Sequence, residues 1–384
     1  MSGFIRNLFR SPKDETGFAF SRPLVVLQSD DWGRVGVRDR EGYEQLRASG
    51  LRLGERAYDL YTLETADDVR ALAALLDRHH DSTGRPPCMV MNVCTSNLDF
   101  KKMQGDGYKA LSMLPLAEGL PGNWSRPGLL EAYRDGCKRG VFYPGLHGVN
   151  HFCPVAVENA LAEDSDRAEQ LRLLWQAETP YIFWRMPWVG YEYWNPEKPH
   201  AGFLPEKHQK ALIEQAIRNF SAVFGFRPRS ACAPGFRANR DTHAAWFREG
   251  IRVAESGTES GIHAPHIDEL GILHLYRVID FEPSQRDLEI DKYLEIAGEC
   301  FSRGLPLTIS VHSINFHSTL KNFRDTTIAA LDRFLSALES RYTELLYVHD
   351  WDVYAIVNAG AFRIHGTRTA VTVRRLETQS QPAT

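Results

Sequence analysis

The chain has 384 residues, of which 43% are hydrophobic and 24% are charged, and its formal net charge is −4. This is ordinary globular composition, and a chain of this length can bury a core without disulfide staples. The small negative charge gives a nucleic-acid partner no electrostatic support, so we expect none. The six cysteines form no C-x-x-C pair, which disfavours zinc-ribbon and thioredoxin-like proteins.

The first ten residues lack the long apolar segment of a signal peptide, and no stretch approaches about 18 apolar residues. We therefore expect a cytoplasmic protein with reduced cysteines. If residues 4–10 are helical, Phe4, Ile5, Leu8 and Phe9 share one face. That face predicts either a weak contact with a membrane surface or a chain end that packs on the domain. The oligomeric state stays open.

Short apolar runs alternate along the chain with segments whose apolar residues recur at helical spacing. The expected strands are Leu24–Gln28, Cys88–Val93, Val141–Leu146, Ser230–Ala233, Ile251–Glu255, Leu307–Val311 and Leu345–Val348, with Ile272–Val278 as a further candidate. Apolar stripes at Val69–Leu76, Leu212–Phe220 and Ile328–Leu338 predict helices. This alternation is typical of a parallel sheet with helical crossovers, and the number of units favours an α/β barrel.

We expect an N-terminal segment over residues 1–20, one barrel domain over 21–365 and a polar, disordered tail over 376–384. Two long stretches with several Gly and Pro, 100–127 and 179–205, are expected as loop insertions at the barrel rim. The second is dense in aromatic residues over 181–194, which either bind substrate or pack against the barrel or another subunit.

Three apolar runs end in polar side chains that would meet at one end of a barrel. Asp30 and Asp31 follow the first strand, His147 follows Val141–Leu146, and His312 follows Leu307–Val311. His151 lies four residues after His147, a spacing that puts two imidazoles on one face of a helix or tight turn. One ligand carboxylate, two imidazoles and a spare carboxylate that activates water are the parts of a metal-dependent hydrolase. Adjacent strand residues point to opposite sides, so the two aspartates can differ in role only if the strand end twists or bulges.

This combination resembles the polysaccharide deacetylase family, the NodB-homology or chitin-deacetylase-like carbohydrate esterases. The family motif T-F-D-D-G is similar to Gln28–Gly33, with one residue inserted before the glycine. The motif H-S/T-x-x-H is similar to His147–His151, with Gly148 in place of the hydroxyl residue, and the motif L-x-x-H is similar to Ile309–His312. The resemblance implies a distorted (β/α)7 barrel with its active site at the carboxyl ends of the strands.

The resemblance also implies a divalent metal ion, zinc first, with iron, cobalt or nickel left open. By this resemblance Asp31, His147 and His151 bind the ion. Asp30 is then the general base that activates water, and His312 is the general acid for the leaving amine.

One family motif is incomplete. The motif R-x-P supplies an arginine that orients the base, and the matching stretch Ser230–Arg237 has Cys232 in the arginine position and Pro234 in the proline position. We predict that Arg237, or as a second choice Arg240, reaches Asp30 instead. The alternative is that Asp30 lacks its partner and activity is reduced or lost.

The sequence therefore predicts a metal-dependent hydrolase that removes an acyl group, acetyl first, from an N-acylated sugar or glycan precursor. Two alternatives stay open. One is hydrolysis of another non-peptide C–N amide bond, such as that of a formamide or ureide. The other is a degenerate, non-catalytic member of the same fold that binds a glycan or a partner protein.

Overall fold

The computed structural model describes residues 17–163, 165–197, 202–257, 261–364 and 367–376. The predictions for residues 4–10 and for the tail beyond residue 376 lie outside these ranges. Within them, no helix combines the length and the apolar character that crossing a bilayer requires.

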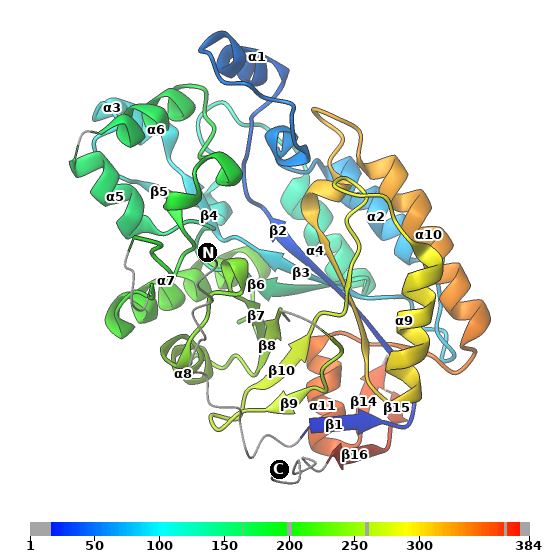
Figure 1. The fold of residues 1–384 in the computed structure, drawn as a ribbon. Helices are drawn as coiled ribbons and strands as arrows, with labels where there is room; N and C mark the ends of the chain where they lie inside the picture. The colour runs from blue at the N-terminus through cyan, green and yellow to red at the C-terminus, as the bar shows by residue number, and fades with distance from the viewer. Residues whose placement is uncertain (1–16, 164, 198–201, 258–260, 365–366, 377–384) are drawn as a thin grey trace, which may run out of the picture.

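A curled sheet of 12 strands forms the centre of the molecule (Figure 1). Its order is β11-β12-β2-β3-β6-β7-β8-β10-β9-β1-β16, and β13 also pairs with β2. The parallel strands are β2 (Leu24–Trp32), β3 (Met89–Val93), β6 (Phe142–Leu146), β7 (Ser230–Cys232), β8 (Val253–Ser256), β10 (Leu273–Tyr276), β11 (Ile279–Asp280), β12 (Leu307–His312) and β13 (Leu346–Tyr347). Antiparallel pairing adds β9 (His266–Ile267), β1 (Gly17–Phe20) and β16 (Val373–Leu376).

One extended segment joins the two ends of the curled parallel sheet. Its first half, β10, pairs with β8, and its second half, β11, pairs with β12 on the other side. Only Arg277 and Val278 separate the two halves. The expected α/β class with a parallel sheet is confirmed. The sheet has more than the expected seven strands: nine are parallel, and the antiparallel strands β9, β1 and β16 extend one edge.

Eleven α-helices accompany the sheet in the described ranges. They are α1 (Arg40–Ala48), α2 (Ala66–Leu76), α3 (Phe100–Gly105), α4 (Leu129–Arg139), α5 (Pro154–Ala162), α6 (Asp166–Gln176), α7 (Glu206–Phe224), α8 (Arg240–Arg248), α9 (Ile290–Ser302), α10 (Arg324–Arg341) and α11 (Asp350–Ala359). The three apolar stripes of the sequence correspond to α2, α7 and α10. Figure 1 shows α2, α9 and α10 along one side of the sheet, while α3, α5 and α6 gather at another corner.

The two expected rim insertions carry short elements of their own. Residues 100–127 contain α3 and β5 (Met113–Pro115), which pairs with β4 (Ser96–Leu98). Residues 179–205 contain two short 3₁₀ turns. Near the C-terminus, β14 (Ala361–Ile364) and β15 (Thr367–Ala370) form a separate hairpin.

Alternation along the strands separates an inner row of side chains from an outer row. Leu24 and Val26 of β2 pack with Leu273 of β10 in one buried cluster, whereas the opposite row of β2 packs with residues of α2 and α10. Successive side chains of a strand point to opposite faces. Asp30 therefore continues the inner row of β2, and Arg277 continues the inner row of β10. Near the carboxyl ends of the strands the inner rows become polar.

Candidate active site

Asp30 lies in the inner row, and an arginine binds both oxygens of its carboxylate. Arg277 donates from Nη1 to Oδ2 at 2.7 Å and from Nη2 to Oδ1 at 2.6 Å. Asn92 donates to Oδ1 at 2.9 Å, and the Cys232 thiol lies 3.7 Å from Oδ2. Burial alone would raise the pKa of Asp30, but the positive charge of Arg277 holds it below its ordinary value. Asp30 is therefore an ionised acceptor.

The guanidinium of Arg277 uses all five of its N–H groups. Besides the two bonds to Asp30, Nε donates to Gln28 Oε1 at 3.3 Å, Nη1 to Ser310 Oγ at 2.9 Å and Nη2 to Glu255 Oε2 at 2.7 Å. The Arg277 side chain is only 4% exposed. Because every N–H of the planar guanidinium has an acceptor, the orientation of Arg277 is fixed, and so is that of the Asp30 carboxylate that it binds.

The prediction that Arg237 or Arg240 reaches Asp30 is wrong. The Arg237 guanidinium lies over the ring of Trp194, with its Cζ 4.8 Å from the ring centroid. Arg240 is largely exposed, and its Nε lies 3.2 Å from Glu269. The physical reason is position: β7 ends at Cys232, and a 3₁₀ turn over Pro234–Phe236 follows. Residues beyond that turn no longer belong to the inner row.

Cys232 lies beside Asp30, with its sulfur 3.7 Å from Oδ2. Its sulfur lies 3.6 Å from Arg277 Nη2. The arginine that contacts Asp30 thus comes from the junction of β10 and β11, and it occupies the space next to the shorter thiol side chain.

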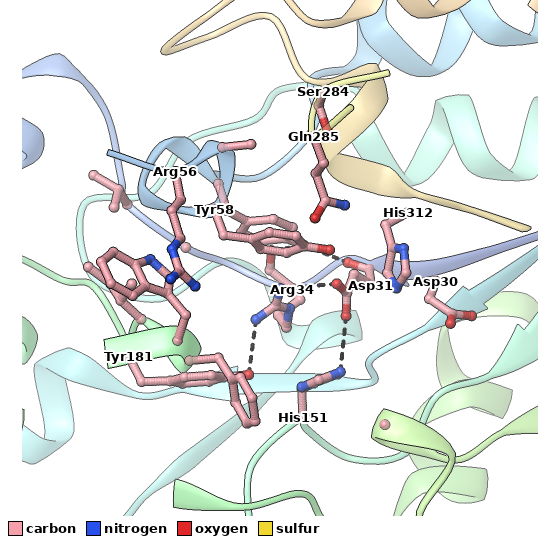
Figure 2. Close-up of a pocket in the computed structure, with 18 of the residues that line it drawn as sticks. Asp30, Asp31, Arg34, Arg56, Tyr58, His151, Tyr181, Ser284, Gln285 and His312 are labelled. Carbon is pink, nitrogen blue, oxygen red and sulfur yellow. Dashed lines mark hydrogen bonds and ion pairs between the residues drawn. The ribbon is translucent and has the colours of Figure 1, made fainter. Parts of the chain in front are cut away.

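Asp31 occupies a bulge at the end of β2. Its φ angle is 73°, in the left-handed region that residues other than glycine adopt rarely. The register between β2 and β3 shifts between Ser29 and Trp32, so the strand end is irregular, as separate roles for the two aspartates require. Figure 2 shows the carboxyl groups of Asp30 and Asp31 pointing in different directions. Arg34 donates to Asp31 Oδ2 at 3.1 Å.

His147 and His151 present ring nitrogens to the other oxygen of Asp31. His147 Nδ1 lies 2.8 Å from the carbonyl oxygen of Cys232, so Nδ1 carries the proton and Nε2 keeps its lone pair. The Nε2 atoms of His147 and His151 lie 3.6 Å and 3.4 Å from Asp31 Oδ1. Burial lowers the pKa of His151 to about 3, although Asp31 opposes the shift. A neutral imidazole at pH 7 can bind a metal.

These three residues fit a small divalent cation. Asp31 Oδ1 and His147 Nε2 are buried without a hydrogen-bond partner among the described residues, and such orphaned groups are costly. One donor atom from each of Asp31, His147 and His151 lies within 4.8 Å of the others. Bonds of about 2.1 Å at the tetrahedral angle separate two ligand atoms by about 3.4 Å. The observed spacings are close to that value.

Glu192 supports the loop between the two histidines. Its Oε1 accepts from the backbone N–H groups of Val149 at 2.7 Å and Asn150 at 3.2 Å. Burial raises the pKa of Glu192 to about 7. The sequence reasoning missed this residue, because it lies in the aromatic stretch 181–194 with no signal of its own.

His312 ends β12 and pairs in register with Asp30 of β2. Its Nδ1 lies 2.6 Å from Glu282 Oε1, and Asn315 donates to Glu282 Oε2 at 2.6 Å. Burial would lower the pKa of His312, but the Glu282 carboxylate, followed by Asp31 and Asp30, raises it to about 9. The His312 side chain is 32% exposed. It is therefore a protonated, accessible imidazolium at neutral pH.

The two aspartates and the three histidines open onto one cavity of about 640 Å³, whereas Glu192, Glu282 and Arg277 do not line it (Figure 2). Its polar floor contains Asp30, Asp31, His147, His151 and His312. Its walls are mainly aromatic and include Tyr58, Tyr61, Tyr181, Phe183, Trp184, Tyr191 and Phe236, with Arg34, Arg56, Ser284 and Gln285 among the polar residues. The aromatic stretch 181–194 thus supplies part of the wall.

The sequence did not predict the charged partners of Asp30, His312 and Asp31, which are Arg277, Glu282 and Arg34. Arg277 had a signal, since it is the single charge in the apolar run Ile272–Val278. A charged residue inside a buried strand has to find a partner. Glu282 and Arg34 lie in connecting segments just past strand ends, where charged residues are common and carry no signal.

Comparison with known proteins gives matches among solved structures alone: no family model matches the chain, and no curated protein does. A protein assigned as a polysaccharide deacetylase from Mycobacterium smegmatis is 12% identical, with a TM-score of 0.48 over 88% of this chain and 91% of that chain. A protein with the same assignment from Pseudomonas aeruginosa PAO1 is 12% identical, with a TM-score of 0.46 over 90% and 93%. A family 4 carbohydrate esterase from Streptomyces lividans, in complex with acetate, is 11% identical, with a TM-score of 0.33 over 85% and 92%. Polysaccharide deacetylases and family 4 esterases are thus among the structures that this chain is similar to.

Proposed function

We propose that this chain is a metal-dependent hydrolase that removes an acyl group, acetyl first, from an N-acylated sugar or glycan precursor. The observation that carries the proposal is the buried Oδ1 of Asp31. It has no hydrogen-bond partner in the described residues and faces the Nε2 atoms of His147 and His151 at 3.6 Å and 3.4 Å. The motifs at these positions add the resemblance to polysaccharide deacetylases.

Asp31, His147 and His151 would hold the cation, with zinc as the first choice. When bound, such a cation polarises a carbonyl group and lowers the pKa of water towards about 7. Asp30 then takes up a proton from the attacking water, for which its carboxylate is already ionised and oriented by Arg277. His312, protonated through Glu282, donates a proton to the departing amine.

The cavity suits a sugar-sized substrate. Its volume of about 640 Å³ lies within the usual range of small-molecule sites. Aromatic side chains such as Tyr58 and Trp184 in its walls offer flat apolar faces on which sugar rings stack. These features support a single acylated sugar or the end of a glycan as the substrate.

Arg277 bears on the non-catalytic alternative. That alternative rested on the missing motif arginine, which would leave the base without a positive partner. Arg277 provides that partner with two bonds to Asp30, so the observation favours a working base. Hydrolysis of another C–N amide by the same residues is the second candidate, since every proposed catalytic step concerns the amide and none concerns the sugar.

The test is acyl release by purified protein that has been stripped of metal and reloaded with zinc. N-acetylglucosamine and its short oligomers are the first substrates, with a formamide and a ureide in parallel. We expect metal-dependent acetate release that the Asp30→Asn variant lacks. Release from the formamide or ureide alone would favour the second candidate. No release from any of them by metal-loaded protein would favour the binding protein.

A further inference from the structure

A second group of metal-ligating side chains lies on the opposite, outer row of β10. His274 belongs to that row, His243 lies on α8, and Asp268 lies in the turn between β9 and β10. His274 Nε2 is 3.3 Å and His243 Nδ1 is 3.8 Å from Asp268 Oδ2. None of the three lines the cavity of the candidate active site. One oxygen and two imidazole nitrogens therefore converge at a separate place.

The surrounding structure aims each donor atom. Asp268 Oδ1 accepts from the backbone N–H groups of Leu270 at 3.0 Å and Ile272 at 2.9 Å, so Oδ2 is turned towards the imidazoles. His274 Nδ1 lies 3.2 Å from Ser256 Oγ, and Nε2 on the other side of the ring faces Asp268 Oδ2. Outer partners of this kind fix the orientation of metal-binding histidines.

The histidine rings are held by their neighbours as well. His266 stacks on His274, with ring centroids 4.7 Å apart and planes at 6°. His243 lies against Trp246, with ring centroids 5.6 Å apart. Rings held by stacking lose little further freedom when they bind an ion, and preorganised ligands bind more tightly.

We propose that His243, Asp268 and His274 bind a second divalent cation of the zinc class. One donor atom from each residue lies within 4.8 Å of the others, and two imidazoles with one carboxylate suit Zn²⁺, Co²⁺ or Ni²⁺ better than Mg²⁺ or Ca²⁺. The side chains of His243, His274 and Asp268 are 20%, 10% and 8% exposed, so solvent can complete the coordination.

The ion would act as a structural tie. It would join α8, which packs outside the sheet, to β10 and to the turn before it. Arg277 follows His274 by three residues in the same extended segment. A tie at His274 would therefore hold the strand that delivers the partner of Asp30.

A simple hydrogen-bonded cluster is the alternative. His274 and Asp268 are within hydrogen-bond distance at 3.3 Å, and such a pair could only fasten the turn. His243 Nδ1, at 3.8 Å from the same oxygen, is too far for a hydrogen bond. A hydrogen-bonded cluster uses only one of the two imidazoles that face Asp268 Oδ2, whereas a shared cation would use both.

The test measures how many ions bind to the wild type and to variants that lack one site, the other site or both. Metal-free full-length chain is titrated with Zn²⁺ and with Co²⁺, and bound metal is measured by elemental analysis and by the visible absorption of cobalt. We expect about two ions per chain in the wild type and about one in His243→Ala. His151→Ala removes only the site at Asp31 and should also bind about one, while the double variant should bind almost none. His208→Ala, an exposed histidine on α7, is the matched control and should behave as the wild type.

The outcomes separate this inference from the proposed function. One ion in the wild type and none in His151→Ala would overturn the second site. Unchanged stoichiometry in His243→Ala would overturn it too. Two ions in the wild type with no acyl release would leave the second site standing and count against the hydrolase. His243 lies partly exposed on α8, and circular dichroism checks that the His243→Ala variant is folded.

Discussion

Replacing Arg277 with methionine removes the cation from a buried group of carboxyls. Asp30 loses two hydrogen bonds and Glu255 loses one, and both are almost fully buried. Removing one partner of a buried ion pair costs about 3–5 kcal/mol, because the remaining charge is left uncompensated. We therefore expect Arg277→Met to lower the free energy of unfolding at pH 7 by about 3–5 kcal/mol.

The loss should depend on pH in a defined direction. The folded-state pKa of Asp30 lies below its ordinary value of 3.8, so its pairing with Arg277 stabilises the fold above that pH, and this contribution is lost as pH falls through the lowered pKa. The stability gap between the wild type and Arg277→Met should therefore narrow as pH falls below about 3.8. Turnover should fall by about 10² or more, because the base is no longer held ionised.

The assay is urea unfolding followed by tryptophan fluorescence, with acetate release measured on the same preparations. Arg277→Lys keeps the charge but offers three donors in place of five, so it should lie between the wild type and the methionine variant. Arg237→Met is the matched control. Arg237 stacks on Trp194 and contacts no Asp30 oxygen in the described structure, so we expect a change in stability of at most about 1 kcal/mol.

Two results would refute this reasoning. If the free energy of unfolding of Arg277→Met lies within about 1 kcal/mol of the wild-type value and turnover is unchanged, Arg277 does not keep Asp30 ionised. If turnover is lost in Arg237→Met and kept in Arg277→Met, the first prediction from the sequence was correct and the assignment from the structure is wrong.

Three further predictions concern the proposed roles. Asp30→Asn should lower turnover by about 10² or more with metal content unchanged, and loss of the metal would make Asp30 a ligand. His151→Ala should abolish zinc binding at the Asp31 site, as measured by chelator competition, and retained binding at that site would remove His151 from the ligand set. Glu282→Gln removes the carboxylate that raises the pKa of His312 to about 9. Since an acid must be protonated, kcat/KM falls as pH rises through that pKa, and the basic limb should move to lower pH in this variant; an unmoved limb would show that another group sets it.

Local pattern was enough to locate most of the parallel strands of the central sheet. Runs of β-branched and other apolar residues gave β2, β3, β6 and β12 to within a few residues. β2 continues past the expected end at Gln28 to Trp32, because β12 pairs with it as far as Asp30 and β3 pairs with it again at Trp32. Pattern within one segment cannot show such partners, so the strand appeared to stop where its polarity changed.

The partners of the site residues could not be found from the sequence alone. Arg277 and Asp30 are 247 residues apart, and their contact depends on which strands are neighbours and on their register. His312 was placed correctly beside Asp30 because both end apolar runs. Glu282, which sets the charge of His312, follows no pattern, and its role appears only when the chain after β11 returns to the end of β12.

The replacement of the motif arginine follows from the geometry of the inner rows. Parallel strands that curl around a common centre bring side chains of the same layer together, whichever strand carries them. Asp30 of β2, Asn92 of β3, Cys232 of β7 and Glu255 of β8 all lie in that layer and contact one another or Arg277. A cation for Asp30 can therefore come from any of these strands, provided that the side chain is long enough and belongs to the inner row. The cysteine in the arginine position of one motif therefore describes β7 alone. The charge state of Asp30 depends on the side chains that all the strands contribute to this layer.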